Sequence, residues 1–202
     1  MRSLSVVALL LMGWAAAGTL AAAAPASIEN VKKGTYAFDP DHTQVGFDIM
    51  HMGLSTFFGR FGKVTGTANF DLDAPQASTI DAVIDMTDID THVAALDGIL
   101  KRLFKADKFP TAQFRSTAIA ATGANTGTVT GDLTIAGVTK SITLDVVFNG
   151  GRNSPIPFQP YRIGFDAKGT IKRSDFGLDN TIWSGLVSDE VGLRIEAEGE
   201  LQ

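Results

Sequence analysis

The sequence has 202 residues, of which 45% are hydrophobic and 19% charged, and it contains no cysteine. These values are typical of one folded domain with a sizeable core and exclude a disordered chain. Seventeen Lys and Arg residues against 22 Asp and Glu residues give a net charge of -5, so no broad basic surface for nucleic acid is expected. The absence of cysteine excludes disulfides, zinc–cysteine and iron–sulfur sites, and a thiol nucleophile.

The N-terminal segment has the pattern of an export signal. Arg2 is followed by the apolar run 4–11 and then by a stretch rich in alanine, and no further charged residue occurs before Glu29. A basic start, a short apolar run and a series of small residues are typical of a secretory signal peptide. We therefore predict that residues 1–26 are a signal peptide.

Export has consequences for the rest of the chain. We predict a mature domain at residues 27–202, with cleavage after Ala26 or Ala23, and no membrane span once the signal is removed. A domain of this size can be stabilised by its core without disulfides, and this fits a bacterial periplasm. The alternative is that the N-terminal segment is retained as a membrane anchor, since it is long enough to span a bilayer.

Hydrophobic and polar residues alternate with period two over most of the mature chain. At the C-terminus, for example, Val191, Leu193 and Ile195 alternate with Arg194 and Glu196. Such alternation predicts half-buried β-strands, and one dry and one wet face suggest an antiparallel sheet. About eight strands fit either a closed up-and-down barrel or a sandwich. The predicted strands are residues 44–51, 63–72, 80–86, 113–121, 126–135, 140–149, 161–171 and 187–201.

One segment has helical spacing instead. Leu96, Ile99, Leu100, Leu103 and Phe104 recur at intervals of three and four, and the pattern ends before a proline. We predict a short helix or loop insertion around residues 93–107, placed between strands, where it could cap one end of a barrel.

Five segments in order along the chain carry a further signal: residues 36–47, 51–61, 108–116, 131–140, and 173–178 followed by 187–191. They resemble the hallmark segments of the YceI-like family, and the resemblance extends over residues 34–202. It implies an all-β fold, an eight-stranded antiparallel lipocalin-like barrel exported to the periplasm. It also implies a long apolar cavity that binds a polyisoprenoid or similar amphiphilic lipid, and a possible homodimer.

The chain departs from the family pattern at residues 96–106. Where many members carry a polar Arg-Asp and His-Leu motif, this chain has Leu96 and Ile99 in place of the arginine and the histidine. The segment is therefore more apolar and more basic. This change allows a different headgroup, or a quinone-like or purely apolar ligand.

An unfilled interior is indicated by small residues with inward parity, because a packed barrel favours larger aliphatics. A core filled by side chains is the alternative. The small residues are Gly66, Ala68, Ala82, Ala112, Ala118, Ala167, Gly169 and Ala197. The predicted ligand-binding residues are Phe47, Ile49, His51, Met52, Phe57, Phe58, Phe61, Phe70, Phe114, Phe148, Phe165 and Trp183.

The segment 50–61 is the most unusual local feature, because methionines and phenylalanines are separated by Gly53 and Gly59. Such a glycine-punctuated apolar loop could form an adaptable cavity entrance around Phe57 and Phe58. The alternative is a satellite cluster that packs the loop onto the barrel.

The three histidines form no metal-binding motif on one element, so no metal site is expected. His42 lies beside Asp39 and Asp41, and we expect it to make a turn-stabilising hydrogen bond. No catalytic motif occurs in the sequence, and we predict a binding protein whose only small-molecule partner is an isoprenoid or fatty-acyl lipid. Two alternatives are an envelope enzyme that acts on a small apolar or quinone-like substrate with His51 as acid or base, and a structural protein with a solid barrel.

Overall fold

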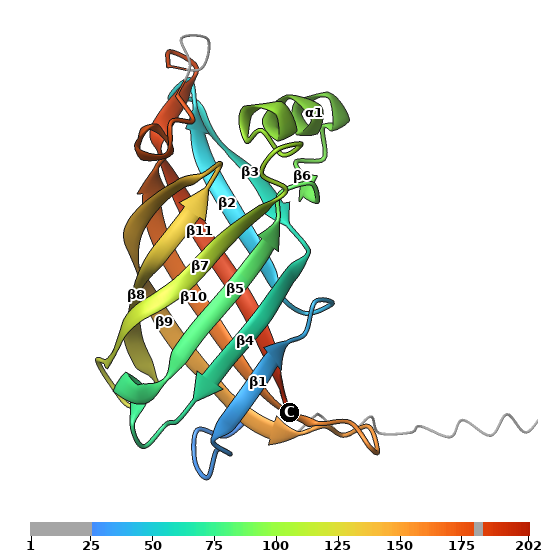
Figure 1. Cartoon of the computed structure of the whole chain (residues 1–202), viewed down its shortest axis with the longest axis vertical. Helices are drawn as coiled ribbons and strands as arrows, with labels where there is room; N and C mark the ends of the chain where they lie inside the picture. The colour runs from blue at the N-terminus through green and yellow to red at the C-terminus, as the bar shows by residue number, and fades with distance from the viewer. Residues whose placement is uncertain (1–25, 180–183) are drawn as a thin grey trace, which may run out of the picture.

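The structure is a computed structural model that describes residues 26–179 and 184–202. It consists mainly of β-strands with one α-helix (Figure 1). The strands are β1 (Gly34–Phe38), β2 (Gln44–His51), β3 (Ser55–Phe61), β4 (Val64–Phe70), β5 (Thr79–Asp85), β6 (Ile89–Asp90), β7 (Thr111–Ala121), β8 (Thr126–Ile135), β9 (Val138–Asn153), β10 (Tyr161–Lys172) and β11 (Val187–Leu201). The helices are α1 (Ala94–Leu103) and the 3₁₀ turns η1 (Pro75–Ala77) and η2 (Arg173–Phe176).

Strand pairing closes the sheet into a barrel. Eight strands form the ring in the order β1-β4-β5-β7-β8-β9-β10-β11, and β1 pairs with β11 to complete it. All the pairings are antiparallel. The predicted eight-stranded antiparallel barrel is therefore confirmed, and the sandwich alternative is wrong. Closure leaves no free sheet edge in the ring.

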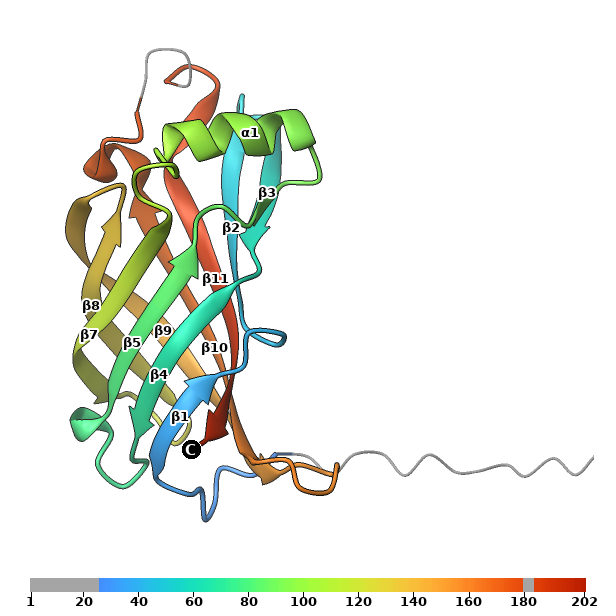
Figure 2. The ribbon, with the colours of Figure 1, turned by 45° about the vertical axis from the view of Figure 1, so that its right-hand side comes forward.

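The remaining strands extend one end of the ring. Both β1 and β2 pair with β11, at its two ends, and β2 continues the sheet outward through β3 and β6. The strands are interrupted at residues 39–43, between β1 and β2, and at residues 62–63, between β3 and β4. In Figure 2, α1 lies across this end of the barrel, next to β2 and β3. We call it the helix end.

The opposite end carries Gln202 and the connections 71–78, 122–125 and 154–160, and we call it the C-terminal end (Figure 1). These connections lie at the same end because, in an antiparallel sheet, every second connection between neighbouring strands lies at the same end. The predicted helix within residues 93–107 is also confirmed, as α1. None of the helices among the described residues has the length and apolar character needed to cross a bilayer.

Two sequence interpretations are corrected by the strands. Residues 55–61, interpreted as part of a glycine-punctuated loop, form strand β3, which pairs with β2 throughout. Gly59 leaves room for the Phe47 ring there, because a Cβ atom at this position would lie 2.3 Å from Cζ of Phe47. In β7, the register shifts between Ser116 and Ala118, so Ala118 is exposed instead of inward-facing. The bulge inserts one residue and reverses the parity beyond it.

Candidate functional site

The barrel encloses an apolar cavity of about 330 Å³. Its middle is lined by aliphatic and aromatic side chains, among them Val64, Ile84, Phe114, Leu144 and Ile195. No charged residue is among the described residues that line it. Burial of a charge in such a cavity is costly, whereas each buried CH2 group contributes roughly 0.8 kcal/mol. The cavity therefore favours an uncharged hydrocarbon chain.

Small side chains leave this space open. Ala68, Ala82, Ala167 and Ala197 all line the cavity, as their inward parity predicted. They come from β4, β5, β10 and β11, so the free volume lies between opposite walls of the ring. A barrel packed solid by its own side chains would need larger residues at these positions. The filled-core alternative therefore does not hold for this part of the barrel.

A close glycine contact positions Phe114 in the wall. Phe114 on β7 pairs with Leu133 on β8, and both side chains line the cavity. Gly131 lies two residues before Leu133, and a Cβ atom there would lie 2.5 Å from Cζ of the Phe114 ring. The glycine thus lets the ring lie against the β8 backbone and leaves the centre of the barrel free.

The cavity reaches the surface at the C-terminal end. Its lining there includes Pro75 and Ser78 from the β4–β5 connection, and Ala120, Ala121 and Ala124 from the β7–β8 hairpin. The three alanines are exposed, so they form the mouth of the cavity. The polar residues that line this region are uncharged: Asn69, Thr79, Asn125, Thr126 and Thr128. They offer hydrogen bonds, but no ion pair, to the polar end of a ligand.

An aromatic cluster lies beside β1, in the part of the barrel near the C-terminal end. The rings of Phe70, Phe148 and Phe165 lie with their centres 5.0 to 5.4 Å apart, and Tyr36 meets Phe70 edge-on at 6.4 Å. The Tyr36 side chain is fully buried, and its hydroxyl donates to the carbonyl oxygen of Lys32 at 2.5 Å. Burial, with a smaller effect of Tyr161, raises the pKa of Tyr36 to about 12. The neutral phenol therefore persists at every physiological pH.

The helix end is closed by packed side chains. Leu100, Leu103 and Phe104 from α1 and the turn after it pack against the core, and Phe104 lies 6.0 Å from Phe61, ring centre to ring centre. The N-terminal turn of α1 is held by Asp97, which accepts hydrogen bonds from the backbone and hydroxyl of Thr91 at 2.9 and 2.5 Å. No residue of α1 lines the cavity. The cavity therefore has its mouth at the other end of the barrel.

The predicted ligand-binding residues fall into three groups. Phe70, Phe114, Phe148 and Phe165 line the cavity. Those near the helix end do not line it, and Trp183 lies outside the described residues. The residues near the helix end are Phe47, Ile49, His51, Met52, Phe57, Phe58 and Phe61.

Phe47 and Phe61 belong to the core of the helix end, with their rings 5.8 Å apart. Met52 and Phe58 are exposed, by 56% and 67%. The β2–β3 hairpin thus projects away from the cavity, and the entrance expected at Phe57 and Phe58 lies instead at the opposite end. Ligand binding by these residues stays a prediction.

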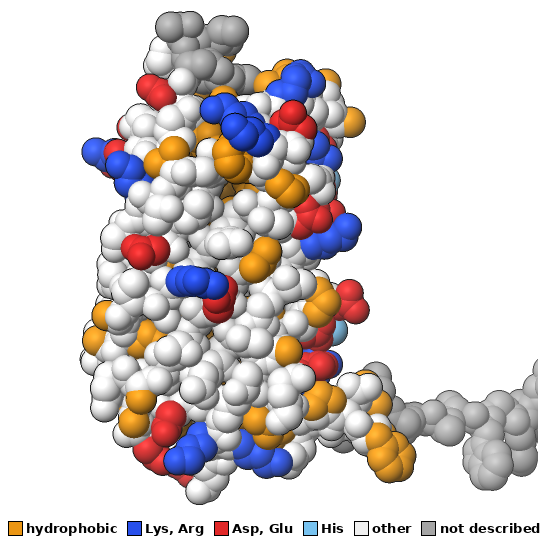
Figure 3. All heavy atoms as spheres, viewed as in Figure 1, with side chains coloured by type: hydrophobic (Ala, Val, Ile, Leu, Met, Phe, Trp, Pro, Cys, Tyr) orange, Lys and Arg blue, Asp and Glu red, His pale blue; other side chains and the backbone are white. Residues whose placement is uncertain are grey.

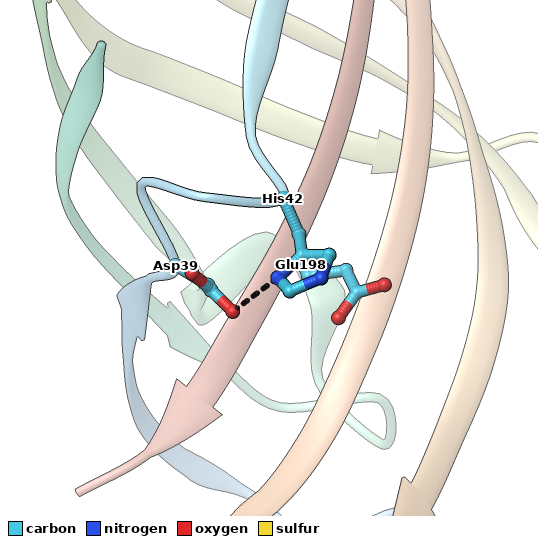
Figure 4. Close-up of side chains that lie close together, drawn as sticks. All are labelled: Asp39, His42 and Glu198. Atoms are coloured by element: carbon cyan, nitrogen blue, oxygen red, sulfur yellow. Dashed lines mark hydrogen bonds and ion pairs between the residues drawn. The ribbon is translucent and has the colours of Figure 1, made fainter. Parts of the chain in front are cut away.

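A polar cluster lies where β1 breaks off, outside the cavity (Figure 4). The Nδ1 atom of His42 is 2.7 Å from Oδ2 of Asp39, which confirms the predicted hydrogen bond. Nη1 of Arg162 donates to the same Asp39 oxygen at 2.5 Å and to Glu198 at 3.1 Å. Burial alone would raise the pKa of Asp39, but hydrogen bonds from Arg162 and His42 outweigh it and lower the pKa to about 2.

The same cluster is the one group of potential metal ligands among the described residues, formed by Asp39, His42 and Glu198. The guanidinium of Arg162 already donates to Asp39 and to Glu198. A metal ion would have to displace this cation or bear its repulsion. The arrangement therefore acts as an ion-pair clasp. It holds the connection between β1 and β2 against β10 and β11.

His51, the proposed acid or base of the enzyme alternative, lies at the end of β2 on the exposed hairpin. Its imidazole has no hydrogen-bond partner among the described residues, and it does not line the cavity. A general acid or base must lie within hydrogen-bonding reach of its substrate. The geometry therefore gives the enzyme alternative no support.

Comparison with known proteins shows the family of the chain. Residues 36–199 match the family model of the YceI-like domain. The chain belongs to the YceI family. Among its YceI-family relatives, Protein YceI from Escherichia coli O157:H7 is 38% identical over 176 residues, which cover 85% of both chains.

Two solved structures share the YceI-family barrel. The crystal structure of Burkholderia cenocepacia BcnA superimposes with a TM-score of 0.71 at 26% identity, and the match covers 80% of this chain and 98% of BcnA. A polyisoprenoid binding domain from Saccharophagus degradans matches with a TM-score of 0.65, over 85% of this chain and 100% of that domain. At 18% identity, the second likeness shows the fold alone.

The residues at the mouth of this YceI-family barrel were missed by the sequence interpretation. The segment 118–127 combines alanines and glycines with small polar residues, and it contains a hairpin turn. Small residues around a turn can mark a place where the surface stays open. The helix predicted within residues 93–107 could have indicated which end is covered, but the sequence interpretation placed the entrance at Phe57 and Phe58.

Proposed function

We propose that this YceI-family protein binds a long-chain isoprenoid or a similar amphiphile, such as a fatty-acyl lipid, in the cavity of its barrel. The apolar chain lies between Phe114, Leu144 and Ile195, and the polar end lies at the mouth beside Asn125 and Thr126. The observation that carries this proposal is a cavity that has no charged lining residue and an uncharged polar mouth. A ligand of this kind needs no ion pair for recognition, because burial of its chain supplies the affinity.

The location and role form part of the same proposal. The N-terminal pattern of Arg2 and the apolar run 4–11 supports export to the periplasm, where the protein sequesters or carries the lipid. The polyisoprenoid binding domain of Saccharophagus degradans has the same fold and is consistent with this role. A homodimer stays a prediction, which analytical ultracentrifugation of the purified protein can test.

We further propose that the protein acts by binding and not by catalysis. The His51→Ala variant tests the enzyme alternative. If His51 were an acid or base, the variant would abolish a turnover of a quinone-like substrate that survives in His42→Ala. We expect the His42→Ala variant to keep the lipid content of wild type, since its side chain does not line the cavity.

The test of the proposed ligand is direct. The protein is purified from its native host without detergent and extracted with organic solvent, and the extract is analysed by mass spectrometry. We expect an isoprenoid or acyl lipid in a stoichiometric amount. Protein that yields no lipid, and that takes up neither geranylgeraniol nor palmitate in solution, would contradict the proposal.

A further inference from the structure

The loop between β9 and β10 exposes two large apolar side chains. In this loop, residues 154–160, Ile156 is 61% exposed and Phe158 is 107% exposed, more than in an extended reference chain. We call it the proline loop because three of its seven residues, Pro155, Pro157 and Pro160, are prolines. Adjacent exposed apolar side chains of this size are typical of contact sites.

The proline loop is held in this shape by its own bonds. The backbone N–H of Ile156 donates to Oγ of Ser154 at 3.1 Å, and that of Gln159 donates to the carbonyl oxygen of Ile156 at 3.3 Å. Phe158 has a φ of 68°, a conformation that bulky residues rarely adopt. Prolines reduce the number of alternative backbone conformations. The loop therefore presents Ile156 and Phe158 to the outside at a low cost in conformational entropy.

The proline loop lies at the same end of the barrel as the cavity mouth. It connects the C-terminal end of β9 to the start of β10, and the connections that form the mouth lie at this end too (Figures 1 and 2). Two lysines lie at this end: Nζ of Lys32 lies 4.9 Å from the ring centre of Tyr161, and the exposed Lys33 forms an ion pair with Asp71, with 3.8 Å between Nζ and Oδ2. Figure 3 shows basic side chains at this end beside hydrophobic and acidic ones.

We propose that the C-terminal end docks on a lipid bilayer, with Ile156 and Phe158 inserted below the headgroups and Lys32 and Lys33 beside the phosphates. This inference rests on the proposed function and names the surface with which the barrel exchanges its ligand. A convex apolar loop flanked by lysines suits a bilayer interface, where the lysine ammonium groups reach the headgroup phosphates. Docking at this end turns the mouth towards the membrane, so an apolar chain can enter the cavity without crossing bulk water.

The path of the chain supports the bilayer as the occupant. Ser27 and Gly151 exchange two backbone hydrogen bonds, of 3.2 and 2.8 Å, so the N-terminal segment joins the domain two residues from the end of β9. The apolar run 4–11 precedes this junction. On the export proposed above, this run enters a membrane, and the end of the barrel that Ser27 joins is the end tethered to it.

Vesicle flotation tests the proposal. Exported, processed protein is mixed with vesicles of phosphatidylethanolamine and phosphatidylglycerol, and the floating fraction is measured for wild type and for the double variant Ile156→Thr/Phe158→Asn. Asparagine tolerates the left-handed backbone of residue 158, so the loop keeps its shape. We expect the variant to bind the vesicles about tenfold more weakly or worse, because two large side chains no longer insert.

The helix end provides a matched control. Met52 and Leu54 are likewise two residues apart and exposed, and Met52 has a φ of 53°. The double variant Met52→Asn/Leu54→Thr removes a similar apolar surface far from the mouth, and we expect its vesicle binding to equal that of wild type. Loss of binding in this control, or equal binding of wild type and the Ile156/Phe158 variant, would overturn the proposal. The proposal would also be overturned if wild type did not bind the vesicles. It would be overturned as well if wild type and the Met52/Leu54 variant were dimers and the Ile156/Phe158 variant a monomer, because the loop would then be a contact between two copies of the chain.

A second readout separates this inference from the proposed function. Uptake of geranylgeraniol from solution is measured for the same proteins in the absence of vesicles. We expect the Ile156/Phe158 variant to take up the lipid as wild type does, because neither residue lines the cavity. Uptake without vesicle binding would overturn the docking and leave the proposed function intact. Vesicle binding without uptake would contradict the proposed function alone.

Discussion

Nη1 of Arg162 lies 2.5 Å from Oδ2 of Asp39, although the two residues are 123 positions apart in the chain. Asp39 follows β1 at the point where the chain leaves the ring, and Arg162 lies at the start of β10. Glu198 and Glu200, both on β11, also accept hydrogen bonds from the guanidinium. The ion pairs thus connect the segment between β1 and β2 to β10 and β11.

Replacement of Asp39 by asparagine should destabilise the fold. The carboxylate is 7% exposed, and its loss leaves Arg162 with less compensation for its own burial. We expect the free energy of unfolding to fall by about 2 kcal/mol, measured by urea denaturation. The control is Asp41→Asn at an exposed neighbour, which should change it by less than about 0.5 kcal/mol. Equal stabilities of the two variants would show that the ion pair contributes little.

The same cluster makes stability depend on pH in two directions. The pKa of Asp39 is lowered from 3.8 to about 2, so its contribution is present above pH 3.8 and is lost as the pH falls towards 2. The hydrogen bond with Asp39 raises the pKa of His42 above 6.5, so the contribution of His42 is present below pH 6.5 and is lost as the pH rises through its folded pKa.

The two effects together predict a stability maximum between pH 3.8 and pH 6.5 for this cluster. Thermal unfolding as a function of pH checks it. The His42→Ala variant should lose the decline on the alkaline side and keep the decline on the acid side. An unchanged alkaline decline in this variant would assign that decline to other groups.

Replacement of Met52 by asparagine should stabilise the protein. Met52 and Gly53 have φ values of 53° and 68° and form the turn of the β2–β3 hairpin. Two residues with positive φ are typical of a type I′ turn, for which Asn-Gly is the favoured pair. We expect an increase of about 1 kcal/mol in the free energy of unfolding. Met50→Asn, in the extended strand, serves as the control and should give no gain.

Gly66 should tolerate no side chain. It has a φ of 128°, and a Cβ atom there would lie 2.0 Å from the backbone oxygen of Asp81. Since a backbone atom cannot move away as a side chain does, Gly66→Ala should cost about 2 kcal/mol or more in unfolding free energy. The control Gly185→Ala, at a position with no atom within 4 Å, should be neutral in the same urea titration. A neutral Gly66→Ala would contradict the close approach of β4 and β5.

Local sequence patterns predicted much of the fold. The alternation of Val191, Leu193 and Ile195 with charged residues predicted β11 with its observed bounds, and the spacing of Leu96, Leu100 and Leu103 predicted α1. These patterns are local consequences of one dry face, so neighbouring residues suffice to reveal them.

The site depended on long-range structure and was predicted less completely. Four of the predicted residues, such as Phe70 and Phe114, line the cavity because inward parity held in their strands. The bulge near Ala118 reversed the parity in β7, and nothing in the composition marks such a bulge. The position of the mouth depends on which end α1 and the turn after it cover, and the contact of Phe104 with Phe61 that closes this end is a tertiary one.

The account depends most on the cavity as the place of the ligand, and native mass spectrometry tests it. Wild type, Ala82→Phe and Val83→Phe are incubated with geranylgeraniol; Ala82 lines the cavity, and Val83 lies on the opposite face of the same strand. We expect one bound lipid in wild type and in Val83→Phe, and none in Ala82→Phe. Ala197→Phe is a second cavity variant and should also bind none. If all four proteins carry the lipid equally, or none does, the central claim is contradicted.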